Sequence, residues 1–362
     1  MNVQASSYSQ NDFDHLVYVR LTEACNLHCE HCFIPATPKQ MSINDFKKIP
    51  QIVQSFASPN DNVLLQWHGG EPTIFGIKRL IDAIETIQSS NVPIHWKHGI
   101  QTNLINYNAD WGDLFSTYFN RQIGVSWDPD IRFLNSKKSD VVAYENKFQH
   151  NLKSLIADGV EPTLVMTGTR VFFEKFKHPF KLFEWLVDHD IKLAHIERLT
   201  KTGHAINNWH KLGVDNAEYS RYMSRLYRGY IQWNQNNTDN QVSLSPFDGL
   251  QRSVSVLKNG IHKQAGYGCW SGGCDNRFHT IDATGYQLGC TALTSNDDSS
   301  APWVQLNYNE LRVQRKAPCQ HCEFQKICST GCFATSYEDA SGECSGAKNL
   351  FKTIEQNYSN NE

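Results

Sequence analysis

The stretch that decides the fold is Thr-Glu-Ala-Cys-Asn-Leu-His-Cys-Glu-His-Cys-Phe, residues 22–33. Cys25, Cys29 and Cys32 have three and two residues between them, in a loop that follows the β-branched and aromatic strand-like segment His15–Leu21. Protein iron–sulfur clusters normally have four cysteine ligands, so three thiolates leave one iron of a cubane without a protein ligand. An open coordination position is where a metal site does chemistry. The alternative is a zinc site in which a nearby histidine supplies the fourth ligand.

The spacing Cys-x3-Cys-x2-Cys is that of the radical S-adenosylmethionine (SAM) enzymes, and this stretch resembles theirs. The resemblance implies that the open iron chelates the amino and carboxylate groups of SAM. Reductive cleavage of SAM then gives a 5′-deoxyadenosyl radical, which takes a hydrogen atom from a substrate. The family often has an aromatic residue just before the third cysteine, whereas this chain has His31 there and Phe33 after it.

Composition limits the class of protein. The chain has 362 residues and a net charge of −3, so we expect more than a minimal domain and no nucleic-acid partner. Its apolar runs are shorter than the roughly 20 residues of a membrane span. The first residues are polar and lack the apolar core of a signal peptide. Eleven cysteines then favour metal binding in a reducing cytoplasm over disulfides.

Segments with strand and helix patterns alternate through the first 200 residues, which predicts a parallel sheet with helices outside it. We expect a partial (β/α)6 barrel of the TIM type, with the site at the carboxyl ends of its strands. The predicted strands are 15–21, 62–68, 93–101, 121–127, 163–167 and 193–199. The expected domains are a polar tail (1–12), the radical SAM barrel (13–205), a bridging helix and linker (206–262) and a cysteine-rich domain with a closing helix (263–362). Within the linker, Asn207–Gly213 has the pattern of a loop.

Several strand ends carry residues that resemble the family's SAM-binding elements. Gly69-Gly70-Glu71-Pro72 follows the second strand, about forty residues after the cysteine loop, and resembles the motif that holds the methionine amino group. Either Arg132 or Lys137 is a candidate partner for the SAM carboxylate. Ordinary turn capping, and a Glu197–Arg198 ion pair, are the alternatives for several of these positions. The SAM contacts implied by the resemblance are Phe33, Gly69, Gly70, Glu71, Asn103, Ser126, Lys137, Glu197 and Leu199.

The last hundred residues contain the other eight cysteines. Cys269 comes first, followed by Cys-x10-Gly-x4-Cys from Cys274, then Cys-x2-Cys-x5-Cys-x3-Cys from Cys319, and finally Cys344. This pattern resembles the SPASM extension of peptide-modifying radical SAM enzymes. The resemblance implies two auxiliary 4Fe-4S clusters, which with the SAM cluster account for all eleven cysteines. A zinc ribbon is the alternative, although it leaves the interleaved order unexplained. The ligands implied are Cys269, Cys274, Cys290 and Cys332 for cluster I, and Cys319, Cys322, Cys328 and Cys344 for cluster II.

The resemblance implies an oxidoreductase that abstracts a β-hydrogen from a ribosomally made precursor peptide and forms a crosslink, as in cyclophane-forming maturases. The implied partners are the precursor and a reductant such as flavodoxin or ferredoxin. The leader of the precursor would be recognised either by the barrel and SPASM surfaces or by a separate leader-binding protein. The alternatives are an anaerobic sulfatase-maturing, formylglycine-generating enzyme and a non-catalytic iron–sulfur electron carrier. The sulfatase-maturing branch has Cys-Asp where this chain has Cys290-Thr291, which argues against that branch. The candidates for a general base are Asp128, Glu197, Asp275 and Asp282.

Overall fold

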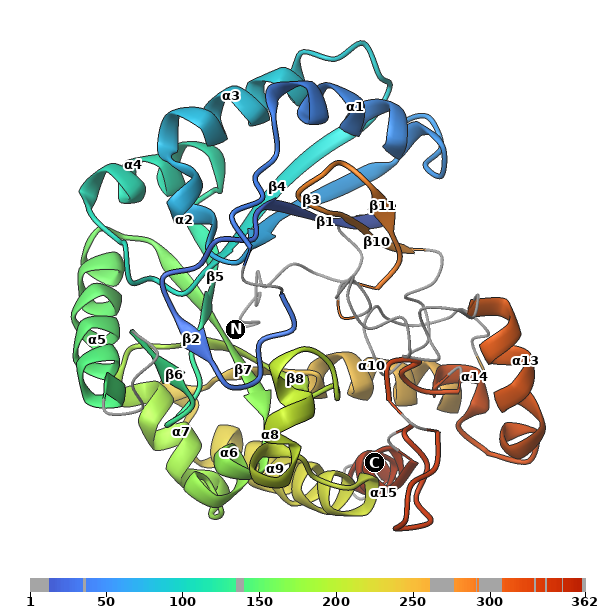
Figure 1. The fold of residues 1–362 in the computed structure, drawn as a ribbon. Helices are drawn as coiled ribbons and strands as arrows, with labels where there is room; N and C mark the ends of the chain where they lie inside the picture. The colour runs from blue at the N-terminus through green and yellow to red at the C-terminus, as the bar shows by residue number, and fades with distance from the viewer. Residues whose placement is uncertain are drawn as a thin grey trace.

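The computed structural model describes residues 13–34, 37–134, 140–260, 277–290, 292, 308–328, 330–335, 337–346 and 348–359. Its centre is a curved sheet of parallel strands, as the sequence predicts (Figure 1). The six predicted strands are all present and all lie parallel to their neighbours. They are β1 (His15–Thr22), β3 (Asn62–Gly69), β4 (His95–Thr102), β5 (Gln122–Ser126), β7 (Glu161–Gly168) and β8 (Leu193–Arg198).

Helices cover the outer side of this sheet (Figure 1). The first begins at Ser42, whose hydroxyl and backbone form a reciprocal capping box with Asp45, and it buries Phe46, Ile49 and Val53. The buried face therefore follows from helical spacing of apolar residues. The helices of this layer are α1 (Ile43–Gln54), α2 (Pro72–Phe75), α3 (Ile77–Gln88), α4 (Ala109–Tyr118), α5 (Val141–Ala157), α6 (Arg170–Lys175) and α7 (Pro179–Asp188).

The two faces of the sheet differ in polarity. In β7, Leu164 and Met166 are fully buried in the main core, whereas the alternating residues Thr163, Val165 and Thr167 are partly exposed. Successive side chains of a strand point to opposite faces. The inner, concave face is therefore the accessible one, and parallel registration brings polar side chains of neighbouring strands together on it.

Later segments extend both edges of the sheet. β9 (Ser243–Ser245) pairs with β8, and β10 (Phe278–Ile281) pairs with β1, both in parallel. β11 (Gln287–Leu288) turns back against β10 and forms an antiparallel hairpin with it. The order among described strands is β11-β10-β1-β3-β4-β5-β7-β8-β9, and β2 (His28–Cys29) pairs separately with β6 (Arg132–Phe133). The cysteine-rich region thus continues the barrel sheet directly.

The predicted loop at Asn207–Gly213 is wrong. Most of that segment belongs to α8 (His204–Leu212), which buries Ala205 and Leu212 against Ile131 and Leu199. Its polar composition hid a short apolar face that only this tertiary contact uses. The remaining helical elements are α9 (Asn216–Asn236), η2 (Thr238–Asn240), α10 (Phe247–Lys258), α13 (Tyr308–Cys319), α14 (Gln325–Cys328) and α15 (Lys348–Ser359).

The closing helix near the C-terminus is confirmed: α15 packs against α9 and α10, with Leu350, Phe351 and Ile354 buried. In the part of the chain that the structure describes, we find no helix with the length and apolarity needed to traverse a bilayer.

Candidate active site

The cysteine loop is seated on the two glycines that follow β3. The backbone N–H of Gly70 donates to the carbonyl of Thr22 at 2.7 Å, and that of Glu71 donates to the carbonyl of Ala24 at 2.9 Å. A Cβ on Gly69 would lie 2.2 Å from the Thr22 oxygen, and one on Gly70 would lie 2.3 Å from the Ala24 oxygen. Only glycine allows this approach, so the motif supports the cysteine loop through its backbone.

Glu71 joins the end of β3 to the end of β4. Its buried carboxylate accepts hydrogen bonds from the backbone N–H and hydroxyl of Thr73, at 3.0 and 2.7 Å. It also accepts from the Thr102 hydroxyl at 2.6 Å and the Asn103 N–H at 2.7 Å. Burial raises the pKa of Glu71, while these donors favour the carboxylate. Glu71, which the resemblance implies to be a SAM contact, therefore also holds the ends of β3 and β4 together.

Asn103 reaches from β4 to the first cysteine. Its amide nitrogen donates to Asn26 Oδ1 at 2.7 Å and lies 3.9 Å from Cys25 Sγ. Its side-chain oxygen accepts from the N–H of Ile105 at 3.0 Å. The side chain is 5% exposed, so it is held against the cysteine loop.

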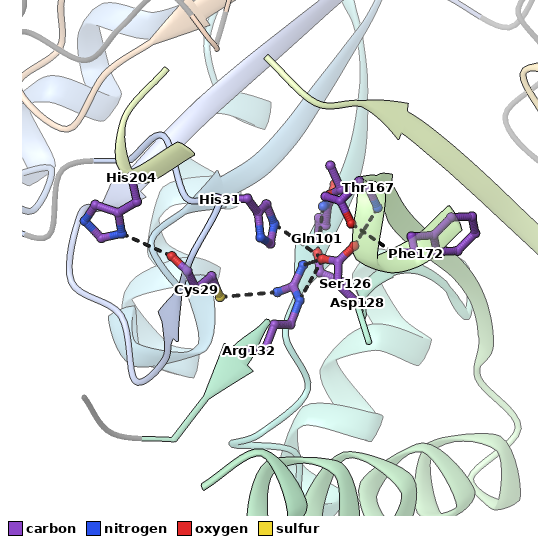
Figure 2. Close-up of polar contacts among 10 residues, drawn as sticks. Cys29, His31, Gln101, Ser126, Asp128, Arg132, Thr167, Phe172 and His204 are labelled. Carbon is purple, nitrogen blue, oxygen red and sulfur yellow. Dashed lines mark hydrogen bonds and ion pairs between the residues drawn. The ribbon is translucent and has the colours of Figure 1, made fainter. Parts of the chain in front are cut away.

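Asp128, two residues after the end of β5, is a second carboxylate with several partners (Figure 2). Its carboxylate accepts from Arg132 Nε at 2.9 Å, from Arg132 Nη2 at 2.6 Å and from the Thr167 N–H at 2.6 Å. Arg132 Nη1 in turn lies 3.8 Å from Cys29 Sγ, and His31 Nε2 lies 3.3 Å from Asp128. Burial lowers the pKa of His31 to about 4 despite the nearby carboxylate, so this imidazole is neutral at pH 7.

This arrangement concerns the two candidate partners of the SAM carboxylate, Arg132 and Lys137. Asp128 binds two of the three guanidinium nitrogens of Arg132 and the third faces Cys29, so the charge of this arginine is already paired within the protein. The other candidate, Lys137, lies outside the described residues. The Asp128–Arg132–Cys29 contact was missed from the sequence, where only the four-residue spacing of Asp128 and Arg132 hinted at a pair.

Helix α8 and the glycine before it close over the other side of the cysteine loop. The backbone N–H of His204 donates to the Cys32 carbonyl at 2.8 Å, and its ring Nδ1 lies 3.1 Å from the Cys29 carbonyl. Lys211 pairs with the buried Glu30 at 2.5 Å. A Cβ on Gly203 would lie 2.4 Å from the Cys32 oxygen. The loop is thus clamped between the end of β3 and the start of α8.

On the inner face of the sheet, β8 presents a paired acid and base. Glu197 Oε1 lies 2.9 Å from His195 Nε2, and the two side chains are 44% and 27% exposed. Burial favours the neutral acid, but the pKa of Glu197 is lowered overall because of His195. The Glu197–Arg198 ion pair considered from the sequence is therefore wrong. Arg198 instead donates to the Ser345 carbonyl at 2.8 Å and hydrogen-bonds to Asn216.

The other implied SAM contacts are spread around the mouth of the barrel. Ser126, at the end of β5, accepts a hydrogen bond from Gln101 Nε2 at 2.8 Å on the inner face. Leu199 is buried in the small apolar cluster with α8, so its side chain packs rather than faces the lumen. Phe33 is partly exposed, with the Arg20 guanidinium 5.9 Å from its ring centre.

The three loop cysteines are held as thiols by their surroundings in the absence of metal. Burial raises the pKa of Cys25 to about 12, and it also raises the pKa values of Cys29 and Cys32. A metal centre here must therefore displace protons from its ligands when it binds. Cys29 is the buried member, and Cys25 and Cys32 are partly exposed.

Four C-terminal cysteines line one cavity of about 330 Å³ between α13, α14 and the chain before α15. They are Cys319, Cys322, Cys328 and Cys344. Cys332 is absent from this lining and packs instead in a separate small cluster with Cys290, Ala292 and Ala334. The described cysteines therefore divide as the implied ligand sets do, while Cys269 and Cys274 lie outside the described residues.

This donor chemistry fits multi-iron clusters. Four thiols that line one cavity, without meeting at a single point, suit a cubane, which binds each thiolate to a different iron. In the described parts of the chain, no three Cys, His, Asp or Glu side chains converge on a point where a single metal ion would be held.

Arg20 connects the loop region with the C-terminal hairpin. It is fully buried on β1, and burial lowers its pKa while Glu23, Asp282, Cys32 and Cys290 raise it. Asp282 itself caps the β10–β11 turn, accepting from Thr284 and Tyr286. Of the four candidate bases, Asp128 and Asp282 are thus engaged structurally, Glu197 faces the lumen, and Asp275 lies outside the described residues.

The chain is similar in sequence to a curated enzyme and similar in fold to solved structures. No family model matches the chain. The sequence is 22% identical over 332 residues to a cysteine-type anaerobic sulfatase-maturating enzyme of Clostridium novyi (strain NT), covering 85% of this chain and 84% of the relative. The solved structure of anSMEcpe with bound AdoMet and the Cp18Cys peptide superposes with a TM-score of 0.69 at 18% identity, over 96% of this chain and 99% of that one.

A second solved structure is similar over most of its length. SuiB of Streptococcus suis, bound to the precursor peptide SuiA, gives a TM-score of 0.56 at 16% identity and covers 89% of this chain and 72% of that one. The chain therefore has the fold of these enzymes, including the cysteine-rich C-terminal region. With its Cys-x3-Cys-x2-Cys loop, it is an enzyme that resembles the radical SAM maturases of peptides and proteins.

Proposed function

We propose that the chain is a radical SAM maturase that acts on a side chain of a ribosomally made precursor peptide and joins it to a second side chain. The observation that carries the proposal is the position of the cysteine loop, clamped by Gly70 and by His204 at the carboxyl ends of parallel strands, over an accessible polar inner face. Cofactor and substrate sites of parallel α/β barrels lie at this end.

Cys25, Cys29 and Cys32 would hold a 4Fe-4S cluster with one open iron, and the two C-terminal cysteine sets would hold two auxiliary clusters. When bound, the cluster and SAM supply the 5′-deoxyadenosyl radical that removes a hydrogen atom from the substrate. Ser126 and Asn103 would orient SAM, and Lys137 would be the partner of its carboxylate. Glu197 and His195 can hold a proton between Oε1 and Nε2, within reach of a peptide on the inner face.

A second candidate is formylglycine formation in a sulfatase. Similarity to the sulfatase-maturating enzyme over 85% of this chain favours it, together with the likeness to anSMEcpe. The residue after Cys290 argues the other way, because Thr291 cannot act as the carboxylate base that the Cys-Asp pair supplies. Both candidates use a peptide substrate and the same radical chemistry.

The proposed clusters and SAM cleavage are tested by anaerobic reconstitution of the full chain. We expect about twelve irons per chain for three cubanes, and 5′-deoxyadenosine after addition of dithionite and SAM. A variant with Cys25, Cys29 and Cys32 all replaced by Ala should keep about eight irons and make no 5′-deoxyadenosine. Zinc in place of iron, or intact SAM under strong reduction, contradicts the proposal.

The two substrates are separated by their products. Peptides from small genes next to this one, and a cysteine-containing sulfatase peptide, are incubated with enzyme, SAM and reduced flavodoxin. A crosslink appears as loss of two hydrogens with fragmentation blocked between the joined residues. Formylglycine appears as an aldehyde that reacts with a hydrazine probe, and that result would favour the second candidate.

A further inference from the structure

A buried arginine lies between the two groups of C-terminal cysteines. Arg315 is in α13, four residues before Cys319, and is 8% exposed. Its Nη1 donates to the carbonyl of Cys332 at 2.8 Å and to that of Thr330 at 3.4 Å, and its Nη2 donates to the carbonyl of Thr335 at 2.8 Å. The guanidinium is therefore fixed by the backbone around Cys332.

The same guanidinium faces the other cysteine group through aromatic rings. Its carbon lies 5.2 Å from the ring centre of Phe333 and 5.9 Å from that of Tyr337. The Tyr337 hydroxyl is 3.6 Å from Cys319 Sγ, and Tyr337 lines the cavity of the four-cysteine group. One cation is thus in direct contact with the backbone of Cys332 and one residue away from the thiol of Cys319.

Three of the four groups that favour the charged form of Arg315 are cysteines, and the fourth is Tyr337. Burial lowers the pKa of Arg315, and Cys332, Cys319, Tyr337 and Cys328 act in the opposite direction. Among the ion pairs formed within the described residues, none joins Arg315 to an aspartate or glutamate. A buried charge is costly unless an opposite charge and hydrogen bonds compensate it. Cysteine thiolates bound to two anionic clusters would supply that compensation.

We propose that Arg315 is a positioning residue shared by both auxiliary clusters, whose fixed positive charge raises the reduction potentials of clusters I and II together. The inference rests on the proposed function, because it requires both clusters. One-electron reduction, by a flavodoxin- or ferredoxin-type donor or by the substrate radical, adds a negative charge to a cluster that is already anionic. A buried guanidinium favours that reduced state, since Coulomb interactions are strong where water is excluded.

The test compares Arg315→Gln, which removes the charge and keeps a hydrogen-bond donor, with Arg315→Lys, which keeps the charge. Arg79→Gln is the matched control, because Arg79 also stacks on an aromatic ring and binds a carbonyl but lies on α3, which contacts α1, α2 and α4. All are made in a background with Cys25, Cys29 and Cys32 replaced by Ala, so that only auxiliary clusters remain. Iron content is counted, and both clusters are titrated potentiometrically with detection by electron paramagnetic resonance.

We expect Arg315→Gln to shift the one-electron equilibrium of each cluster at least tenfold toward the oxidised form, which is about 59 mV. Arg315→Lys should retain most of the wild-type potential, and Arg79→Gln all of it. Full iron with unchanged potentials in Arg315→Gln, or a change in one cluster alone, overturns the proposal. If Arg315→Gln loses iron, recovery of the iron in Arg315→Lys supports a charge effect, and continued loss shows a purely structural clamp and overturns it. A background protein with no auxiliary iron refutes the cluster assignment itself, a result distinct from failure of Arg315.

Discussion

Arg132 binds the carboxylate of Asp128 through both Nε and Nη2, and its remaining nitrogen, Nη1, faces Cys29 Sγ at 3.8 Å. The chain thereby places a paired cation beside the most buried cysteine of the loop. Both members are buried, Asp128 at 0% and Arg132 at 8% exposure. The pair connects the ends of β5 and β7 with the cysteine loop. The position of Cys29 therefore depends on the positions of these strand ends.

Removing one charge of the Asp128–Arg132 pair should destabilise the protein strongly, because the other charge is then buried without its partner. Arg132→Met leaves a buried carboxylate whose main partner is gone, and we expect the free energy of unfolding of the apoprotein to fall by about 3–5 kcal/mol. The double variant Asp128→Asn/Arg132→Met should lose less than the sum of the two single variants, because neither charge is then left alone. Urea unfolding measures all four proteins. Strictly additive losses would show that the pair is not coupled.

The close contact between Gly69 and the cysteine loop predicts different effects for alanine substitutions at Gly69 and Gly76. Gly69 and Gly76 both have positive φ, at 141° and 94°, but only Gly69 has backbone atoms in the space of a Cβ. Gly76→Ala should cost about 1–3 kcal/mol of stability from backbone strain alone and leave iron binding intact. Gly69→Ala should in addition displace Thr22 and lower the iron content of the SAM cluster. Equal iron content in the two variants would contradict the proposed seat.

His98 gives a pH dependence of stability away from the cysteines. It stacks on Trp67, accepts from its indole N–H at 3.2 Å, and burial lowers its pKa from 6.5 to about 4. The unfolded chain therefore binds this proton first as the pH falls. Stability from the neutral ring is complete above pH 6.5, decreases between about 6.5 and 4, and changes no further below that range.

The total loss attributable to His98 is at most about 3 kcal/mol, from 1.36 kcal/mol per pKa unit. His98→Gln keeps an acceptor for Trp67 and should flatten the stability curve in this pH window, as followed by urea unfolding with tryptophan fluorescence. Parallel curves for wild type and variant would show that His98 titrates normally.

The His195–Glu197 pair should act after SAM cleavage. We expect His195→Gln to leave 5′-deoxyadenosine formation within about twofold of wild type and to lower formation of modified peptide by about 100-fold, the lower range for loss of a general acid or base. Thr163→Val, on the same inner face of the sheet, is the control and should affect neither. Mass spectrometry of both products in one reaction separates an effect on SAM cleavage from an effect on peptide modification. A parallel fall of both would place His195 in SAM binding instead.

The sequence alone determined the six parallel strands at the centre of the sheet and the position of the cysteine loop after the first of them. Each depends on a local pattern: apolar periodicity, residue spacing, or glycines beside a strand end. The cap of α1 at Ser42 and the hairpin at β10–β11 have the same local origin. Where the pattern was weak, as in α8, the prediction was wrong.

Only the tertiary structure decided which partner each buried charge has. Arg132 meets Cys29 across 103 residues of sequence, and Arg315 lies between two cysteine groups. Such contacts carry no periodic signal, because they depend on which strand ends the fold brings together. The physical reason is desolvation: once buried, a charged side chain must bind an opposite charge or a carbonyl that happens to be adjacent in space.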